Sequence, residues 1–186
     1  GPKLTEFNFQ NFLKNDEKCF SQKLHPVYKA IELTRKKLNK DKSLISFVGA
    51  PWTLLIYMLN LKKEKLDMDL IKWKEKKIDL NLVIEILTEY LCIHIKNQIN
   101  AGADVVQIFD SWAGFIPEKD IENLCYIPNG KIVEFCNKKK IPNICFPKGI
   151  KEKYVDFNKF VKPNGLNIDS EIDPTWAKTK LQNVVI

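Results

Sequence analysis

Phe47-Val48-Gly49-Ala50-Pro51-Trp52-Thr53-Leu54 and Phe109-Asp110-Ser111-Trp112-Ala113-Gly114 share one pattern. Each is a short apolar run that ends in a compact turn, with aromatic and hydroxyl side chains where the run stops. An apolar run of this length, bounded by turn residues, predicts a buried strand. Because the functional side chains of barrel-type α/β proteins collect at the carboxyl ends of strands, these two turns are candidate parts of a site.

The same pattern recurs along the chain and alternates with amphipathic stretches. Five apolar runs predict strands, and their near-continuous hydrophobicity suits parallel strands covered on both faces. They span residues 44–48, 104–109, 141–146, 165–169 and 183–186. Helical periodicity and capping signals predict helices between them, and Gly102 is the expected stop of the longest one. These helices begin near Pro26, Pro51, Leu80, Pro117 and Pro174.

Strands that alternate with helices predict an α/β fold with right-handed crossovers. An open doubly wound sheet is disfavoured because no glycine-rich phosphate loop follows a strand. The chemically varied strand ends favour a barrel, whose site is assembled from several loops. Since a complete barrel has eight strands and about 250 residues, we expect an incomplete (β/α)8 TIM-type barrel of about five of eight βα units. It would form a single partial domain over residues 3–186, with residues 1–2 left by tag removal.

Composition argues against several classes of function. The net charge of +7 arises from 30 Lys and Arg against 23 Asp and Glu, and Arg35 is the only arginine. Because guanidinium groups are the usual readers of phosphates and bases, this charge indicates a lysine-rich surface and no nucleic-acid partner. No apolar run reaches the roughly 18 residues of a membrane span. Five cysteines without a CxxC pair give no metal-ligand spacing and suit reduced thiols in a cytoplasmic protein.

Several segments, in order and at matching spacing, resemble the uroporphyrinogen decarboxylase family of haem biosynthesis. Residues 43–54 are similar to that family's third strand, and residues 101–114 to its fourth strand and the loop after it. The later similar segments are Ile144-Cys145-Phe146-Pro147-Lys148-Gly149, Leu166-Asn167-Ile168-Asp169 with Asp173-Pro174, and Leu181 through Ile186. The resemblance covers most of the chain from Leu38 onward.

The resemblance implies a carboxy-lyase that removes carbon dioxide from the four acetate arms of uroporphyrinogen, giving coproporphyrinogen without a cofactor or metal. A pyrrole ring protonated beside the acetate becomes an electron sink, so the site must bury a flat macrocycle, hold its acidic arms and deliver protons. By position, Tyr57 and Ser111 match residues that hydrogen-bond acetate or propionate arms. Phe47 and Phe109 match residues that pack on the macrocycle. The family typically forms homodimers.

These residues also have purely structural explanations. Aromatic residues at the ends of apolar strands usually pack in the core, and a tyrosine early in a helix often does the same. Ser111 directly after a strand is a common turn cap, and we expect Asp110 and Asp169 to be capping or turn residues. Lys148 stands where bacterial members carry arginine, which replaces a guanidinium fork by a point charge.

Groups that the family needs for catalysis have no counterpart in this chain. The family's essential aspartate, its carboxylate-binding arginines and a histidine belong to other strands, and His25 and His94 fall on predicted helices. The resemblance therefore implies no catalytic residue here, and we expect the chain alone to be inactive. Two alternatives stay open. One is a methylcobamide:coenzyme M methyltransferase. That family has a His-x-Cys zinc pair near the end of its fifth strand, of which only the cysteine, Cys145, is present here. The other is a non-catalytic remnant that associates through exposed strand edges.

Overall fold

A four-stranded parallel sheet lies at the centre of the molecule. The computed structural model describes residues 8–14, 16–59, 61 and 79–186. The strands are β1 (Ile45–Gly49), β2 (Val105–Asp110), β3 (Asn143–Pro147) and β4 (Gly165–Leu166). They lie side by side in chain order, and each neighbouring pair is parallel. Parallel neighbours need crossover connections, so the sequence-based prediction of a parallel α/β sheet is confirmed.

The first three predicted strands are confirmed, with bounds displaced by one or two residues toward the carboxyl end. The fourth is shorter than predicted, because after Leu166 the backbone makes one more bond to β3, from the Asn167 N–H to the Cys145 carbonyl at 2.9 Å, and then leaves the sheet. Of the fifth predicted strand, the structure shows one bridging residue, Val185, which exchanges backbone hydrogen bonds with Asn164 and Leu166. Asn183 has a φ of 61°, which turns the backbone there, and only an isolated parallel bridge between Gly165 and Val185 follows.

The helices carry the end signals that the sequence predicts. Pro26 lies in the first turn of its helix, and Asp173 caps its helix by accepting the Trp176 N–H at 2.7 Å. Gly102, at φ 110°, follows the longest helix. The single helix predicted at Pro117 is instead a 3₁₀ turn, a π-helix and an α-helix in succession. The helical elements are α1 (Phe9–Leu13), α2 (Glu17–Lys23), α3 (His25–Lys37), α4 (Pro51–Met58), α6 (Leu80–Asn100), η2 (Ala113–Phe115), η3 (Glu118–Asp120), η4 (Glu122–Tyr126), α7 (Ile127–Lys138), η5 (Lys151–Lys153), α8 (Tyr154–Val161) and α9 (Pro174–Lys180).

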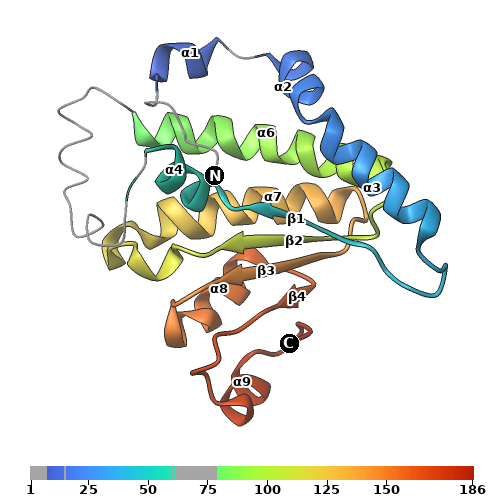
Figure 1. Cartoon of the computed structure of the whole chain (residues 1–186). Coiled ribbons are helices and arrows are strands. Elements are labelled where there is room, and N and C mark those ends of the chain that lie inside the picture. Colours follow the sequence, from blue (N-terminus) through green and yellow to red (C-terminus); the bar gives the residue numbers. More distant parts are fainter. Residues whose placement is uncertain (1–7, 15, 60, 62–78) are drawn as a thin grey trace.

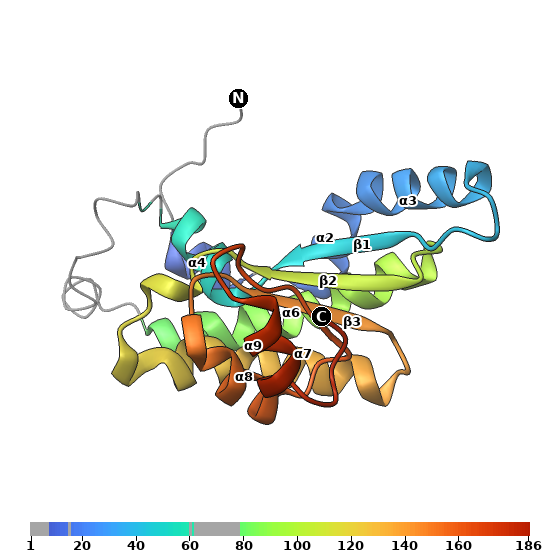
Figure 2. The same cartoon turned by 90° about the horizontal axis from the view of Figure 1, so that it is seen from below.

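The two faces of the sheet differ in their covering. Helices α6, α7 and α8 lie on one side of it (Figures 1 and 2). Side chains alternate along each strand, and one set is buried: Ser46, Val48, Val106, Ile108, Asp110, Asn143, Cys145 and Pro147. The other set is half-buried or exposed, with Phe47 67% exposed. This second face, called the open face below, contrasts with the prediction of a sheet covered on both sides.

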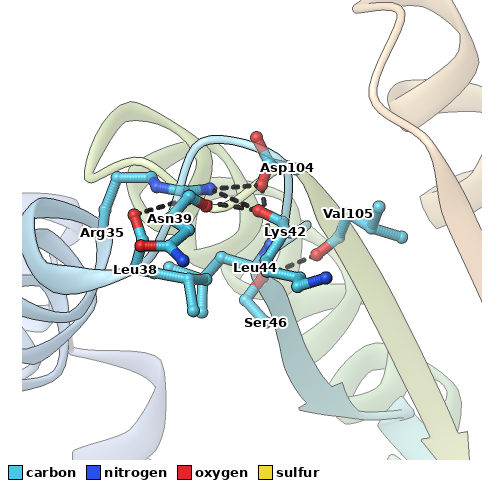
Figure 3. A network of polar contacts seen from close by, with 8 residues as sticks. All are labelled: Arg35, Leu38, Asn39, Lys42, Leu44, Ser46, Asp104 and Val105. Carbon is cyan, nitrogen blue, oxygen red and sulfur yellow. Dashed lines mark hydrogen bonds and ion pairs between the residues drawn. The ribbon is translucent and has the colours of Figure 1, made fainter.

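Arg35 joins the end of α3 to the start of the sheet (Figure 3). Its guanidinium donates to the Asp104 carboxylate at 2.7 Å, and the same carboxylate oxygen accepts the Leu44 N–H at 2.7 Å. Arg35 also donates to three carbonyls of the turn before β1, at 3.1–3.4 Å: Leu38, Asn39 and Lys42. Gly102 makes room for it, because a Cβ there would lie 2.8 Å from Arg35 Cγ. One side chain therefore ties α3 to the chain entering β1 and β2.

The hydrophobic core lies between the sheet and its covering helices. Its largest fully buried side chains come from α8, α4 and α6, including Tyr154, Phe157, Leu55, Ile56 and Ile95. Within the described ranges, no helix combines the length and apolar character required to cross a membrane.

Candidate functional site

Two of the four predicted site residues line one cavity. Tyr57 lies near the end of α4, which follows β1, and Ser111 directly follows β2. Both contribute to a cavity of about 460 Å³, called the Tyr57–Ser111 cavity below. Its other lining residues are Trp112, Gly114, Phe115, Lys148 and Gly149. Segments that follow three adjacent parallel strands thus meet at the carboxyl ends of those strands, where barrel enzymes build their sites.

The turn that carries Ser111 is held by the first turn of α4. The Thr53 hydroxyl oxygen accepts the Trp112 backbone N–H at 3.3 Å, and the Trp52 indole N–H donates to the Trp112 carbonyl at 3.1 Å. The Trp112 ring then packs edge-on against Tyr57, with ring centroids 6.3 Å apart and an interplanar angle of 82°. Tyr57 and Ser111 therefore belong to two segments that are bonded to one another, which fixes their relative placement.

A buried carboxyl group lies beneath this turn. Asp110, the last residue of β2, accepts the Thr53 hydroxyl at 2.8 Å through Oδ1 and the Asn129 amide at 3.1 Å through Oδ2. Burial raises the pKa of Asp110 from 3.8 to about 6, although hydrogen bonds from Thr53, Cys125 and Asn129 act in the opposite direction. Asp110 thus joins β2 to α4 and α7, and it does not cap its own turn as the sequence predicts.

Asp169 has the hydrogen-bonding role predicted for it, although its partners come from other segments. Its Oδ2 accepts the Gly149 N–H at 2.7 Å and the Tyr154 hydroxyl at 3.1 Å. These bonds tie the segment after β4 to the turn after β3 and to α8. Since Gly149 lines the Tyr57–Ser111 cavity, Asp169 supports one wall of it.

The other two predicted site residues lie on the open face of the sheet. Phe47 and Phe109 pack edge to face with ring centroids 6.0 Å apart, and Phe146 continues the row with its centroid 6.3 Å from that of Phe109. We call these three side chains the phenylalanine row. With Phe47 67% exposed and the other two half-buried, the row is not part of the core that the helices cover. It forms an apolar surface that leads to Ser111, two residues after Phe109.

A larger cavity, of about 580 Å³, lies elsewhere on the sheet and is less suited to chemistry. Its lining is mainly apolar and includes Val105, Ile144 and Val185. Two amide side chains that also line it, Asn143 and Asn164, are already bonded to each other at 2.9 Å. The hydroxyl and ammonium groups of the Tyr57–Ser111 cavity make the smaller cavity the better candidate site.

Neither Cys145 nor the two histidines line the Tyr57–Ser111 cavity. Cys145 is fully buried on the helix-covered side of the sheet, and burial raises its pKa well above the ordinary thiol value. Its neighbour Asn143 is bonded to Asn164 and to Asn137. His25 and His94 lie on α3 and α6 as predicted, and burial lowers the pKa of His94. Across the described part of the chain, no group of three or more His, Cys, Asp or Glu residues is arranged to hold a metal ion.

Comparisons with known proteins identify the family. The family model described as uroporphyrinogen decarboxylase (URO-D) matches residues 2–186. The chain belongs to the uroporphyrinogen decarboxylase family. A protein named uroporphyrinogen decarboxylase from Orientia tsutsugamushi (strain Ikeda) is 40% identical over 169 residues, which cover 89% of this chain and 49% of that protein. The uroporphyrinogen decarboxylase of Rickettsia akari (strain Hartford) is 36% identical over 190 aligned positions, covering 100% of this chain and 56% of the relative.

This member of the uroporphyrinogen decarboxylase family therefore spans about half the length of the curated relatives that it matches. Among solved structures, a methyltransferase from Methanosarcina mazei matches with a TM-score of 0.67 at 21% identity, over 87% of this chain and 47% of that one. At this level of identity the likeness concerns the fold alone. It agrees with a parallel α/β architecture that this chain and the methyltransferase share.

Sequence reasoning missed part of the site. Phe146 occupies the position in β3 that Phe109 occupies in β2, since the two residues are direct register partners, so its place at a strand end was a usable signal. Trp112 lies in the turn after β2 and Phe115 directly follows it, but only the folded structure shows that both line the cavity and pack on each other, with ring centroids 5.5 Å apart. Lys148 was singled out by its sequence position, whereas its place on the cavity wall follows from the structure alone.

Proposed function

We propose that this chain is part of a uroporphyrinogen decarboxylase, and that the Tyr57–Ser111 cavity with the phenylalanine row forms one side of the site that binds uroporphyrinogen. The observation that carries the proposal is the convergence of Tyr57 and Ser111 on one cavity from two different strand–helix segments. Family membership over residues 2–186 supports the same reaction class, the loss of carbon dioxide from a tetrapyrrole polycarboxylate.

The chemistry of the described residues suits such a ligand. Hydroxyl groups at Tyr57 and Ser111 donate hydrogen bonds to carboxylate arms, and bonds to a charged acceptor are the stronger kind. The phenylalanine row supplies an apolar wall for a flat macrocycle. Protonation of a pyrrole carbon makes the ring accept the electron pair of the breaking carbon–carboxylate bond as carbon dioxide leaves. A second proton then converts the remaining methylene into a methyl group, and loss of the first proton from the ring carbon restores the pyrrole, so each decarboxylation takes up one proton in total. We assign none of these proton transfers to a residue of this chain. We therefore expect the groups that donate these protons to lie outside it.

We further propose that the sheet is part of an incomplete (β/α)8 barrel, with about five of eight βα units in one partial domain over residues 3–186. The strand order supports this, as does the open face, because a closed barrel covers its outer face with helices and fills its interior with side chains. A homodimer of the complete enzyme in the cytoplasm, without a cofactor or metal, belongs to the same proposal. We also propose that residues 1–2 are a remnant of tag removal.

Three activity measurements test the proposed function. The chain alone, incubated with uroporphyrinogen, should yield no coproporphyrinogen above the buffer control. Addition of the part of the Orientia tsutsugamushi relative that this chain does not match should then restore carbon dioxide release. In the restored enzyme, Tyr57→Phe and Ser111→Ala should each lower kcat/KM by about 10-fold, the equivalent of one hydrogen bond to a charged group. Normal rates in both variants would refute the assignment of these two residues.

A further inference from the structure

The backbone of Lys148 is held from two sides. Its N–H donates to the Asp110 carbonyl at 3.1 Å, and its carbonyl accepts the Gly114 N–H at 2.9 Å, so the turn after β3 is bonded to the end of β2 and to the loop that follows it. The next residue, Gly149, donates its N–H to Asp169 at 2.7 Å. A long flexible side chain thus begins from a main chain whose position is fixed.

Two glycines bring this turn close to the cavity. Gly149 has a φ of 82°, a conformation that side chains disfavour, and a Cβ on Gly114 would lie 2.7 Å from the Gly149 carbonyl oxygen. The loops after β2 and β3 can therefore touch only because neither glycine has a side chain. Their contact places Lys148 on the wall of the Tyr57–Ser111 cavity.

The charge at this wall has no partner within the described residues. Lys148 is exposed, and no carboxylate there forms an ion pair with it, whereas Lys131, Lys138 and Lys153 each pair with a glutamate. The residues that line the cavity include no acidic side chain. The groups available to a ligand are two hydroxyls and one ammonium, which together suit an anion with several acceptor oxygens.

We propose that Lys148 binds a carboxylate arm of the ligand in the Tyr57–Ser111 cavity. This inference rests on the proposed function, and it adds a cationic contact to the two hydroxyl groups. A lysine ammonium is a compact point charge, so it suits one oxygen of a single arm and does not require the fixed fork geometry of a guanidinium.

The test is a titration of the isotopically labelled chain with uroporphyrin, the oxidised macrocycle with eight carboxylates, followed by two-dimensional NMR. The amides of Gly114 and Gly149 and the indole of Trp112 report on the cavity that they line. Lys148→Met removes the charge and keeps the length, and Lys148→Arg keeps the charge. Lys159→Met is the matched control, because Lys159 is exposed on α8 and does not line the cavity. The spectrum of each variant also verifies that it is folded.

We expect Lys148→Met to raise the dissociation constant by about twofold to fivefold, the range for a solvent-exposed charge pair, with Lys148→Arg and Lys159→Met close to wild type. The difference should disappear at about 1 M salt, where the Debye length is about 3 Å. If Lys148→Met and Lys159→Met bind uroporphyrin equally well, while Tyr57→Phe binds it more weakly than wild type, the role of Lys148 is overturned and the proposed function is not. A wild-type chain whose cavity resonances do not move would overturn both this inference and the proposed ligand.

Discussion

Replacement of Asp110 by asparagine should change how the stability of the protein depends on pH. The folded pKa of about 6 exceeds the ordinary value of 3.8, so the folded protein binds more protons than the unfolded chain between those two values. Stability from this group is therefore greatest at low pH and is lost as the pH rises through about 6. At 1.36 kcal/mol for each tenfold change in proton affinity, the buried charge costs about 3 kcal/mol at neutral pH.

The measurement is the free energy of unfolding by urea, at pH values from about 4.5 to about 7, for wild type and Asp110→Asn. Over that range the wild type should lose about 2 kcal/mol relative to the variant. The comparison is needed because His94, whose pKa burial lowers, makes an opposite contribution near pH 6 that is common to both proteins. Asparagine also places an N–H₂ group opposite the Thr53 or Asn129 donor. This mismatch shifts the free energy of unfolding of the variant by an amount that does not vary with pH.

A matched control separates burial from the loss of one negative charge. Asp156 is exposed on α8, so Asp156→Asn removes a carboxylate from the surface and supplies the baseline for the comparison. If Asp110→Asn and Asp156→Asn differ from wild type by the same amount at every pH, the reasoning from burial is refuted. A difference that grows toward low pH would refute its sign.

Three further changes test close contacts at the two ends of the sheet, each by urea unfolding. Arg35→Lys loses the forked contacts and should cost about 1 kcal/mol, and a double-mutant cycle with Asp104→Ala should give a coupling below about 1 kcal/mol because both groups are partly exposed. Gly114→Ala meets the Gly149 backbone and should cost about 1–3 kcal/mol; wild-type stability would contradict the close contact. Asn143→Ala leaves buried partners unsatisfied and should cost about 3 kcal/mol, whereas a loss below about 1 kcal/mol would count against that network.

The order of the strands and the starts of most helices could be predicted from the sequence because their signals are local. Pro26, Asp173 and Gly102 act within one or two helical turns, and apolar runs of about five residues identify strands without knowledge of their neighbours. At the carboxyl end, the apolar run after Asn183 does not show that this residue is left-handed or that only Val185 bridges to the sheet.

The candidate site could be predicted only in part, for a related physical reason. Tyr57 and Ser111 were found through their resemblance to a family, and their shared cavity depends on contacts between residues far apart in the chain, such as the bonds from Trp112 to Thr53 and from Trp52 to Trp112. The burial of Asp110 likewise depends on α4 and α7 together. Loop contacts of this kind leave no periodic signal in a single sequence.

The presence of one arginine has a practical consequence. Because Arg35 is the only guanidinium in the sequence, selective isotopic labelling of arginine yields a single side-chain spectrum that needs no assignment. That spectrum reports on the junction of α3, β1 and β2, where the group donates to Asp104 and to three carbonyls. Slow guanidinium rotation and protection from solvent exchange would indicate that α3 is docked. The denaturant concentration at which both are lost would show whether α3 detaches before the sheet unfolds.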